Sequence, residues 1–152
     1  MKALLLIPVL AIFFASCSKS ESSSDPAVDL STKNNMVAQN NWVVTQYTDS
    51  GNDETSDYAS YTFDFKTDGT FVAASATETF TGTWVLALPN TSPDDSGNDA
   101  TDDKFNKLTI AVTGNKAMDH LSHKWLAEKI TATEIWLRDD NVASNELLRF
   151  AK

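Results

Sequence analysis

The clearest pattern in the chain is an alternation of apolar and polar positions between residues 61 and 88. Apolar side chains recur at every second position in two runs, Tyr61, Phe63 and Phe65, then Phe80, Trp84, Leu86 and Leu88 with Gly82 in phase. A period of two is typical of a strand with one buried face. Asp68-Gly69 interrupts the pattern before Phe71, and such a pair is a strong hairpin signal because glycine accepts a positive φ. The stretch predicts at least three antiparallel strands.

Shorter apolar runs predict five further strands, over residues 41–47, 105–112, 124–130, 134–138 and 145–151. The segments between them are rich in turn-forming residues, and the longest predicted loops are 49–57 and 89–104. Residues 34–40 are expected to form a short helical turn, and residues 116–123 a short helical or irregular link. No segment has a helical pattern long enough to support parallel βαβ units.

Eight consecutive antiparallel strands predict an all-β fold, in which an up-and-down β-barrel removes the exposed sheet edges. A two-sheet β-sandwich is the alternative, because periodicity does not distinguish the two. The interior of an eight-stranded barrel is either filled by side chains or holds one small ligand. The inward-facing positions are therefore the candidate lining of a cavity: Trp42, Val44, Phe63, Phe65, Phe71, Trp84, Leu86, Leu108, Ile110, Ile135 and Leu137.

Residues 1–16 have the pattern of a bacterial lipoprotein signal peptide. Lys2 precedes an apolar run that is shorter than the roughly 20 residues of a membrane-spanning helix. The run ends in Ala15-Ser16 before Cys17, the chain's single cysteine, and this end resembles a lipobox, in which the cysteine is acylated. An ordinary signal peptide with an incidental cysteine is the alternative.

This N-terminus predicts the domain organisation and the location of the protein. Residues 17–35 are polar and serine-rich, and are expected to form a flexible tether. Residues 36–152 then form the barrel domain. Lipid on Cys17 places the protein in the cell envelope as an outer-membrane lipoprotein, on either the periplasmic side or the surface.

The charge of the chain bears on its partners. It carries 21 acidic and 12 basic residues, a formal net charge of −9, and loss of Lys2 with the signal peptide makes this −10. An acidic surface repels polyanions, so nucleic acid is not an expected partner. The membrane, reached through the N-terminal lipid, and a small apolar ligand are the expected partners, and the sequence gives no oligomeric state.

Several polar groups are candidate sites of chemistry. His120 and His123 would share a helix face, but no third ligand lies beside them, and we interpret them as exposed link residues. The carboxylates of residues 94–103 lack the spacing of a Ca²⁺-binding loop and are expected to be solvated. Trp136 has the parity opposite to Ile135 and is either a surface anchor for a partner or covered by the N-terminal segment. No catalytic residue, metal site or cofactor is predicted, and we expect a protein that is not an enzyme.

Several of these residues together resemble the lipocalin-like domain of Bacteroidetes-type lipoproteins. They are Trp42, Phe63-Asp64-Phe65 before Asp68-Gly69-Thr70, Gly82-Thr83-Trp84, and Trp125, Ile135, Leu137 and Phe150. The resemblance covers residues 36–152 and implies an eight-stranded barrel, but the family has no agreed activity to transfer. A membrane-anchored barrel that binds a small apolar ligand is the first expectation for function. A filled barrel that displays its loops to a partner protein is the alternative.

Overall fold

The computed structural model describes residues 26–89 and 105–152. The predicted signal peptide (1–16), Cys17, the first part of the predicted tether (17–25) and the acidic segment 94–103 lie outside the described residues.

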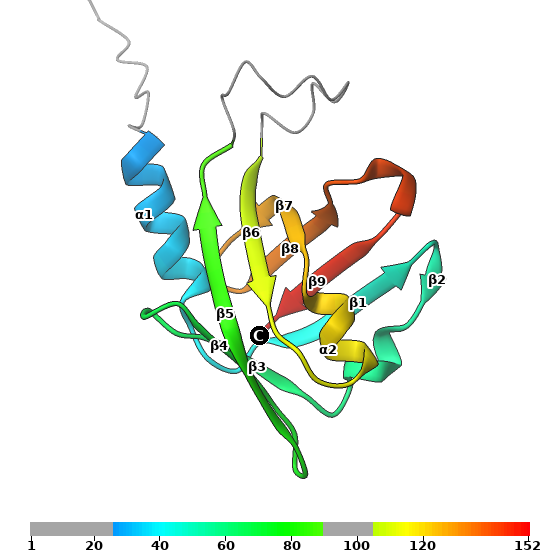
Figure 1. The fold of residues 1–152 in the computed structure, drawn as a ribbon. Helices are drawn as coiled ribbons and strands as arrows, with labels where there is room; N and C mark the ends of the chain where they lie inside the picture. The colour runs from blue at the N-terminus through cyan, green and yellow to red at the C-terminus, as the bar shows by residue number, and fades with distance from the viewer. Residues whose placement is uncertain (1–25, 90–104) are drawn as a thin grey trace, which may run out of the picture.

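The described chain is built on one antiparallel sheet of nine strands, in the order β2-β1-β9-β8-β7-β6-β5-β4-β3 (Figure 1). One sheet excludes the two-sheet sandwich, and consecutive strands from β3 to β9 are neighbours, as the up-and-down prediction requires. The strands are β1 (Val43–Asp49), β2 (Asn52–Asp53), β3 (Thr62–Phe65), β4 (Thr70–Ala74), β5 (Thr79–Ala87), β6 (Asn106–Ala111), β7 (Lys124–Ile130), β8 (Glu134–Asp139) and β9 (Leu147–Ala151).

The prediction of eight strands missed the short β2. Residues 49–57 were expected to form one loop, but Thr48 pairs with Asp53 in a tight hairpin, and the helical turn η1 (Thr55–Tyr58) follows. The two turn residues, Ser50 and Gly51, have φ values of 51° and 81°. Two positive φ values are typical of the type I′ turn that joins twisted antiparallel strands. The Ser-Gly pair was the sequence signal for this hairpin.

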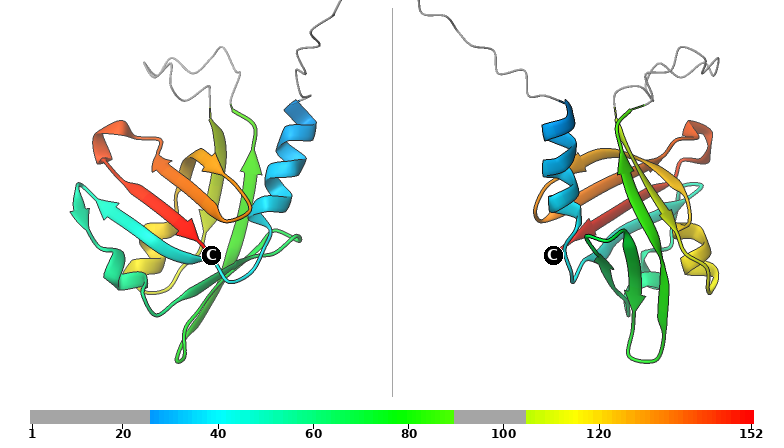
Figure 2. Two further views of the ribbon diagram at one scale, coloured as in Figure 1. Left: turned by 180° about the vertical axis from the view of Figure 1, so that it is seen from behind. Right: turned by 60° about the vertical axis from the view of Figure 1, so that its left-hand side comes forward.

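The sheet curls until the chain at the start of β1 meets β3. Trp42 and Phe63 form an isolated antiparallel bridge, in which Trp42 N donates to Phe63 O (2.9 Å) and Phe63 N donates to Trp42 O (2.8 Å). Phe65 N also donates to Gln39 O (3.1 Å). These contacts join the two ends of the sheet at one narrow place rather than along a full ladder, and the result is a curled, incompletely closed barrel (Figure 2).

The inward parity predicted for eleven side chains is confirmed, since each is buried: Trp42, Val44, Phe63, Phe65, Phe71, Trp84, Leu86, Leu108, Ile110, Ile135 and Leu137. Aromatic rings pack against one another at the centre. Phe65 makes edge-to-face contacts with Trp84 (5.6 Å between centroids) and with Phe150 (5.5 Å). Such pairs add to the stability that burial itself gives. These residues form the hydrophobic core, and their role as the lining of a ligand cavity stays a prediction.

The N-terminal helix corrects the prediction of a flexible tether over residues 17–35. The described residues begin with α1 (Pro26–Val37), so residues 26–35, which were assigned to the tether, belong to the folded unit. Val37 is fully buried in the core, Leu30 packs against the core, and the Lys33 ammonium donates to Asn106 Oδ1 (3.2 Å). The apolar residues of the helix do not gather on one face, so its sequence alone does not predict a stable helix, and these contacts with the barrel explain why it is ordered.

A second helix lies on the opposite side of the barrel from α1 (Figures 1 and 2). The predicted helical link at 116–123 is α2 (Lys116–Leu121), and Asn115 caps its N-terminus by accepting from Met118 N (3.1 Å). A short turn, η3 (Val142–Ser144), joins β8 to β9. Neither helix within residues 26–89 and 105–152 has the length and apolar character of a membrane span.

The predicted Asp68-Gly69 turn is confirmed. Gly69 has a φ of 84°, and Thr70 N donates to the Asp68 carboxylate (2.9 Å). The turn is also attached to β5, because Trp84 N donates to Gly69 O (2.8 Å) and the Trp84 indole N–H donates to Lys66 O (2.9 Å). These bonds hold Trp84 beside the turn, next to the end of α1.

Candidate functional site

A pocket of about 280 Å³ lies where α1 meets the barrel. It is lined by Asn34, Asn35 and Ala38 from α1 and the residue after it, by Thr67 from the β3–β4 turn, and by Trp84 from β5. Trp84 is the one member of the predicted cavity lining among these five residues. Because the indole N–H already donates to Lys66 O, the ring offers carbon surface to a ligand. The pocket therefore combines one edge of the Trp84 ring and Ala38 with amide and hydroxyl groups, and polar atoms make up the larger part of its surface.

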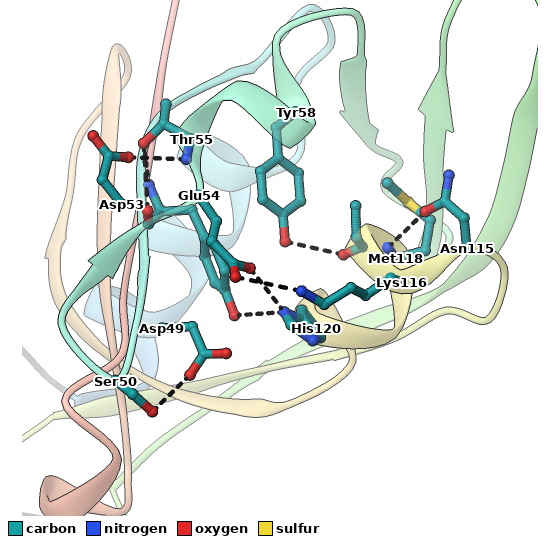
Figure 3. Close-up of polar contacts among 12 residues, drawn as sticks. Asp49, Ser50, Asp53, Glu54, Thr55, Tyr58, Asn115, Lys116, Met118 and His120 are labelled. Carbon is teal, nitrogen blue, oxygen red and sulfur yellow. Dashed lines mark hydrogen bonds and ion pairs between the residues drawn. The ribbon is translucent and has the colours of Figure 1, made fainter.

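A polar network fills the other end of the barrel, between α2 and the β1–β2 hairpin (Figure 3). The Tyr47 hydroxyl lies 3.3 Å from His120 Nδ1, and Glu54 Oε2 lies 3.6 Å from the same nitrogen. The Lys116 ammonium binds the second oxygen of Glu54 (3.3 Å). Asp49 completes a set with Glu54 and His120 in which the possible ligand atoms lie within 4.8 Å of one another. Glu54 and His120 therefore already have partners within the protein.

Two tyrosines connect this network to the core. Tyr47 and Tyr58 are almost fully buried and meet edge to face, with 5.0 Å between ring centroids. The Tyr58 hydroxyl donates to Ala117 O (3.0 Å), which ties α2 to the barrel. Burial raises the pKa of both hydroxyls, and the charge of Glu146 raises that of Tyr47 further. Both tyrosines stay neutral at physiological pH, and their role here is to position α2.

A second cluster lies at the same end, where β7 begins, β8 ends and β9 begins. His123, Asp139 and Glu146 have their possible ligand atoms within 4.8 Å of one another. Asp139 is buried, Glu146 is half-buried and His123 is exposed. Burial and the charge of Asp139 raise the pKa of Glu146. Burial also acts to raise the pKa of Asp139, but hydrogen bonds from Ser144 and the backbone of Asn141, with other groups, outweigh it, so that this pKa is lowered.

The structure thus brings both histidines of the chain next to carboxylates distant in sequence. The interpretation of His120 and His123 as exposed link residues holds for His123, while His120 is half-buried on α2 and bonded to Tyr47. The carboxylates lie near the β1–β2 and β8–β9 connections, far in sequence from the histidines, so no local motif predicts either cluster. The order of the strands could have predicted them, because the end of one antiparallel strand lies beside the start of the next.

Trp136 lies on the outer face of β8, as its parity predicted, and is half-buried. Among the described residues, side chains of the neighbouring strands β7 and β9 cover its ring. The Lys129 ammonium lies 4.4 Å and the Arg149 guanidinium 4.3 Å from the ring centroid. These cations hold the ring by cation–π contacts. A role as a surface anchor for a partner stays a prediction.

Comparison with solved structures identifies the fold. A lipocalin-like protein from Bacteroides uniformis superposes with a TM-score of 0.50, at 16% sequence identity, over 77% of this chain and 98% of that one. A DUF4847 family protein from Bacteroides vulgatus gives a TM-score of 0.48 at 16% identity, over 77% of this chain and 94% of that one. No protein-family model matches the chain, and the search of curated proteins finds no matching relative. The fold is therefore lipocalin-like, as the sequence resemblance implied.

Proposed function

We propose that the protein is a lipid-anchored binding module of the cell envelope, without enzymatic activity, whose lipocalin-like barrel binds a small, largely apolar ligand. The observation that carries this proposal is the pocket of about 280 Å³ at Trp84. Protein sites for small molecules measure roughly 300–1,000 Å³ and place a few polar groups on a mostly apolar wall. The pocket is just below this range, so its ligand is small.

The chemistry of the pocket defines the ligand further. A flat apolar group lies against the Trp84 ring and Ala38, and a polar edge bonds to the amides of Asn34 and Asn35. This placement puts the ligand at the α1 end of the barrel and leaves the ring-filled centre intact. It modifies the expectation of a fully apolar interior site, because the lining includes amide and hydroxyl groups.

A neutral apolar fluorophore, N-phenyl-1-naphthylamine, will show saturable binding to the protein. Ala38→Phe places an aromatic side chain in the pocket and will weaken binding at least about tenfold, which is about 1.4 kcal/mol. Ala59→Phe, at an exposed position outside the pocket, is the matched control and will bind like the unchanged protein. Circular dichroism confirms that both variants are folded. Equal affinity in all three proteins would place the binding site elsewhere.

Membrane attachment through Cys17 is part of the same proposal, and the support for it is the apolar run followed by Ala15-Ser16-Cys17. One acyl chain anchors only weakly, whereas two or more give stable attachment, since each buried CH₂ contributes about 0.8 kcal/mol. Cys17→Ser will move the protein from the membrane fraction to the soluble fraction. Ser23→Ala, in the same serine-rich segment, will leave it in the membrane fraction. Mass spectrometry of the mature N-terminus tests the modification directly, and an unmodified Cys17 on membrane-bound protein would contradict it.

A further inference from the structure

We propose that His123, Asp139 and Glu146 bind a divalent metal ion of the Zn²⁺ type. This site shares no residue with the Trp84 pocket, and the proposal does not depend on ligand binding there. All three side chains lie at the end of the barrel opposite α1, beside the β8–β9 connection.

The backbone places the three residues beside one another. Asp139 is the last residue of β8 and is paired across the sheet with Trp125, two residues after His123. Asp139 N donates to Glu146 O (3.2 Å), and this bond holds the two residues side by side where β8 ends and β9 begins. The imidazole also contacts the Trp125 ring, with 5.7 Å between centroids. The possible ligand atoms of the three side chains lie within 4.8 Å of one another. Because Zn²⁺ binds oxygen and nitrogen at about 2.0–2.2 Å, a bound ion would draw these atoms closer together.

One carboxylate oxygen of this cluster has no hydrogen-bond partner. Glu146 Oε2 is buried, and only one other side-chain atom among the described residues, Asn106 Nδ2, is buried without such a partner. A buried acceptor without a partner is costly, and an ion that the structure does not include is one accepted explanation. Asp139 beside it is buried and already accepts a hydrogen bond from Ser144 Oγ, and both carboxylates carry negative charge when ionised. A cation between them would satisfy the free oxygen and remove the repulsion.

The donor set selects the kind of metal. One imidazole nitrogen with two carboxylates suits Zn²⁺ and related transition metals, whereas Ca²⁺ and Mg²⁺ prefer sites made of oxygen alone. Three protein ligands leave at least one coordination position for water or another ligand. The exposed His123 gives the ion a route from solvent.

The neighbouring cluster of Asp49, Glu54 and His120 provides a comparison within the same molecule. Its glutamate is bound to Lys116, and its histidine is bonded to the Tyr47 hydroxyl. A metal would have to displace these contacts. The same residue types are therefore present twice, but only the His123 cluster has an unpaired buried oxygen.

The test is isothermal titration of the purified, untagged full chain with ZnCl₂, with Cys17→Ser in every sample so that no thiol competes. We expect one saturable site, a rise in melting temperature on adding Zn²⁺, and reversal of both by EDTA. His123→Gln and Glu146→Gln will each weaken binding at least tenfold. His120→Gln, the matched control, will leave the affinity unchanged.

His123 is exposed, so its substitution will not unfold the protein, and the melting temperature without metal checks this. The proposal is overturned if no saturable binding occurs below millimolar Zn²⁺. It is also overturned if His120→Gln weakens binding as much as His123→Gln, because the ion would then lie in the other cluster. Binding of the fluorophore at the Trp84 pocket is measured separately, so the two proposals fail independently.

Discussion

Gly82→Ala is expected to destabilise the protein by about 3 kcal/mol, the upper end of the usual cost of overpacking. A Cβ atom at this position would lie 2.1 Å from Ala111 O and 2.9 Å from Val112 Cα. Both are backbone atoms of the chain that leaves β6 and crosses the inner face of β5, so no side-chain rotation relieves the clash. The β5–β6 pairing, whose first pair is Thr83 with Ala111, would have to open. Urea denaturation, or a fall in melting temperature of about 10 °C, measures the loss.

Gly69→Ala is the matched control for this prediction. Gly69 has a positive φ of 84°, which costs an alanine roughly 1–2 kcal/mol, but its Cβ would lie an ordinary 3.5 Å from Trp84 O. Gly82 is not among the glycines with positive φ, so its cost comes from contact alone. Gly82→Ala must therefore be the more damaging substitution. If Gly69→Ala costs more, backbone strain in the turn outweighs the close approach of β6.

The two glycines illustrate how far the sequence predicts this fold. Asp68-Gly69 between aromatic runs is a local signal, and the structure confirms the turn and its positive φ. Gly82 was in phase with the inward positions of its strand, and the structure has it facing the interior. Position 82 requires glycine because the backbone of Ala111 and Val112, about thirty residues further along the chain, leaves no room for a side chain. A period of two predicts which side of the sheet a residue faces, but not which distant segment packs against it there.

The candidate sites were harder to predict than the strands because their residues come together only through the topology. His123 was visible in the sequence, but its partners Asp139 and Glu146 lie on either side of a different turn. The helical turn expected over residues 34–40 contains the α1 wall of the Trp84 pocket, but its place beside Trp84 was missed. The apolar residues of α1 do not gather on one face, and the contacts that order this helix are with the barrel. Local composition predicted a tether where contacts with the barrel order a helix, and it could not supply the neighbours of either segment.

Trp42→Ala is expected to have the largest effect of any single substitution considered, a loss of about 5 kcal/mol. Complete truncation of a buried Trp costs roughly 3–5 kcal/mol, and the carbonyl that it leaves unpaired adds to this. The Trp42 ring is fully buried, and its indole N–H donates to Val37 O (3.1 Å) inside the core. Its backbone forms the bridge to Phe63 that brings the ends of the sheet together. A domain of this size is stable by only about 5–15 kcal/mol, so the variant should be partly unfolded at 37 °C.

Trp136→Ala, on the outer face of the sheet, is the control for Trp42→Ala. It shows how much of the loss comes from burial in the core and how much from removing any tryptophan. Trp136→Ala removes a ring that contacts Lys129 and Arg149 at the surface, and exposed cation–π contacts are worth about 0.5–1 kcal/mol each. We expect it to cost about 1–2 kcal/mol and to leave the near-ultraviolet circular dichroism of the core unchanged. Trp42→Ala should shift the urea midpoint several times further and lose that signal. Equal shifts in the two variants would mean that the Trp42 ring is not buried in the core in solution.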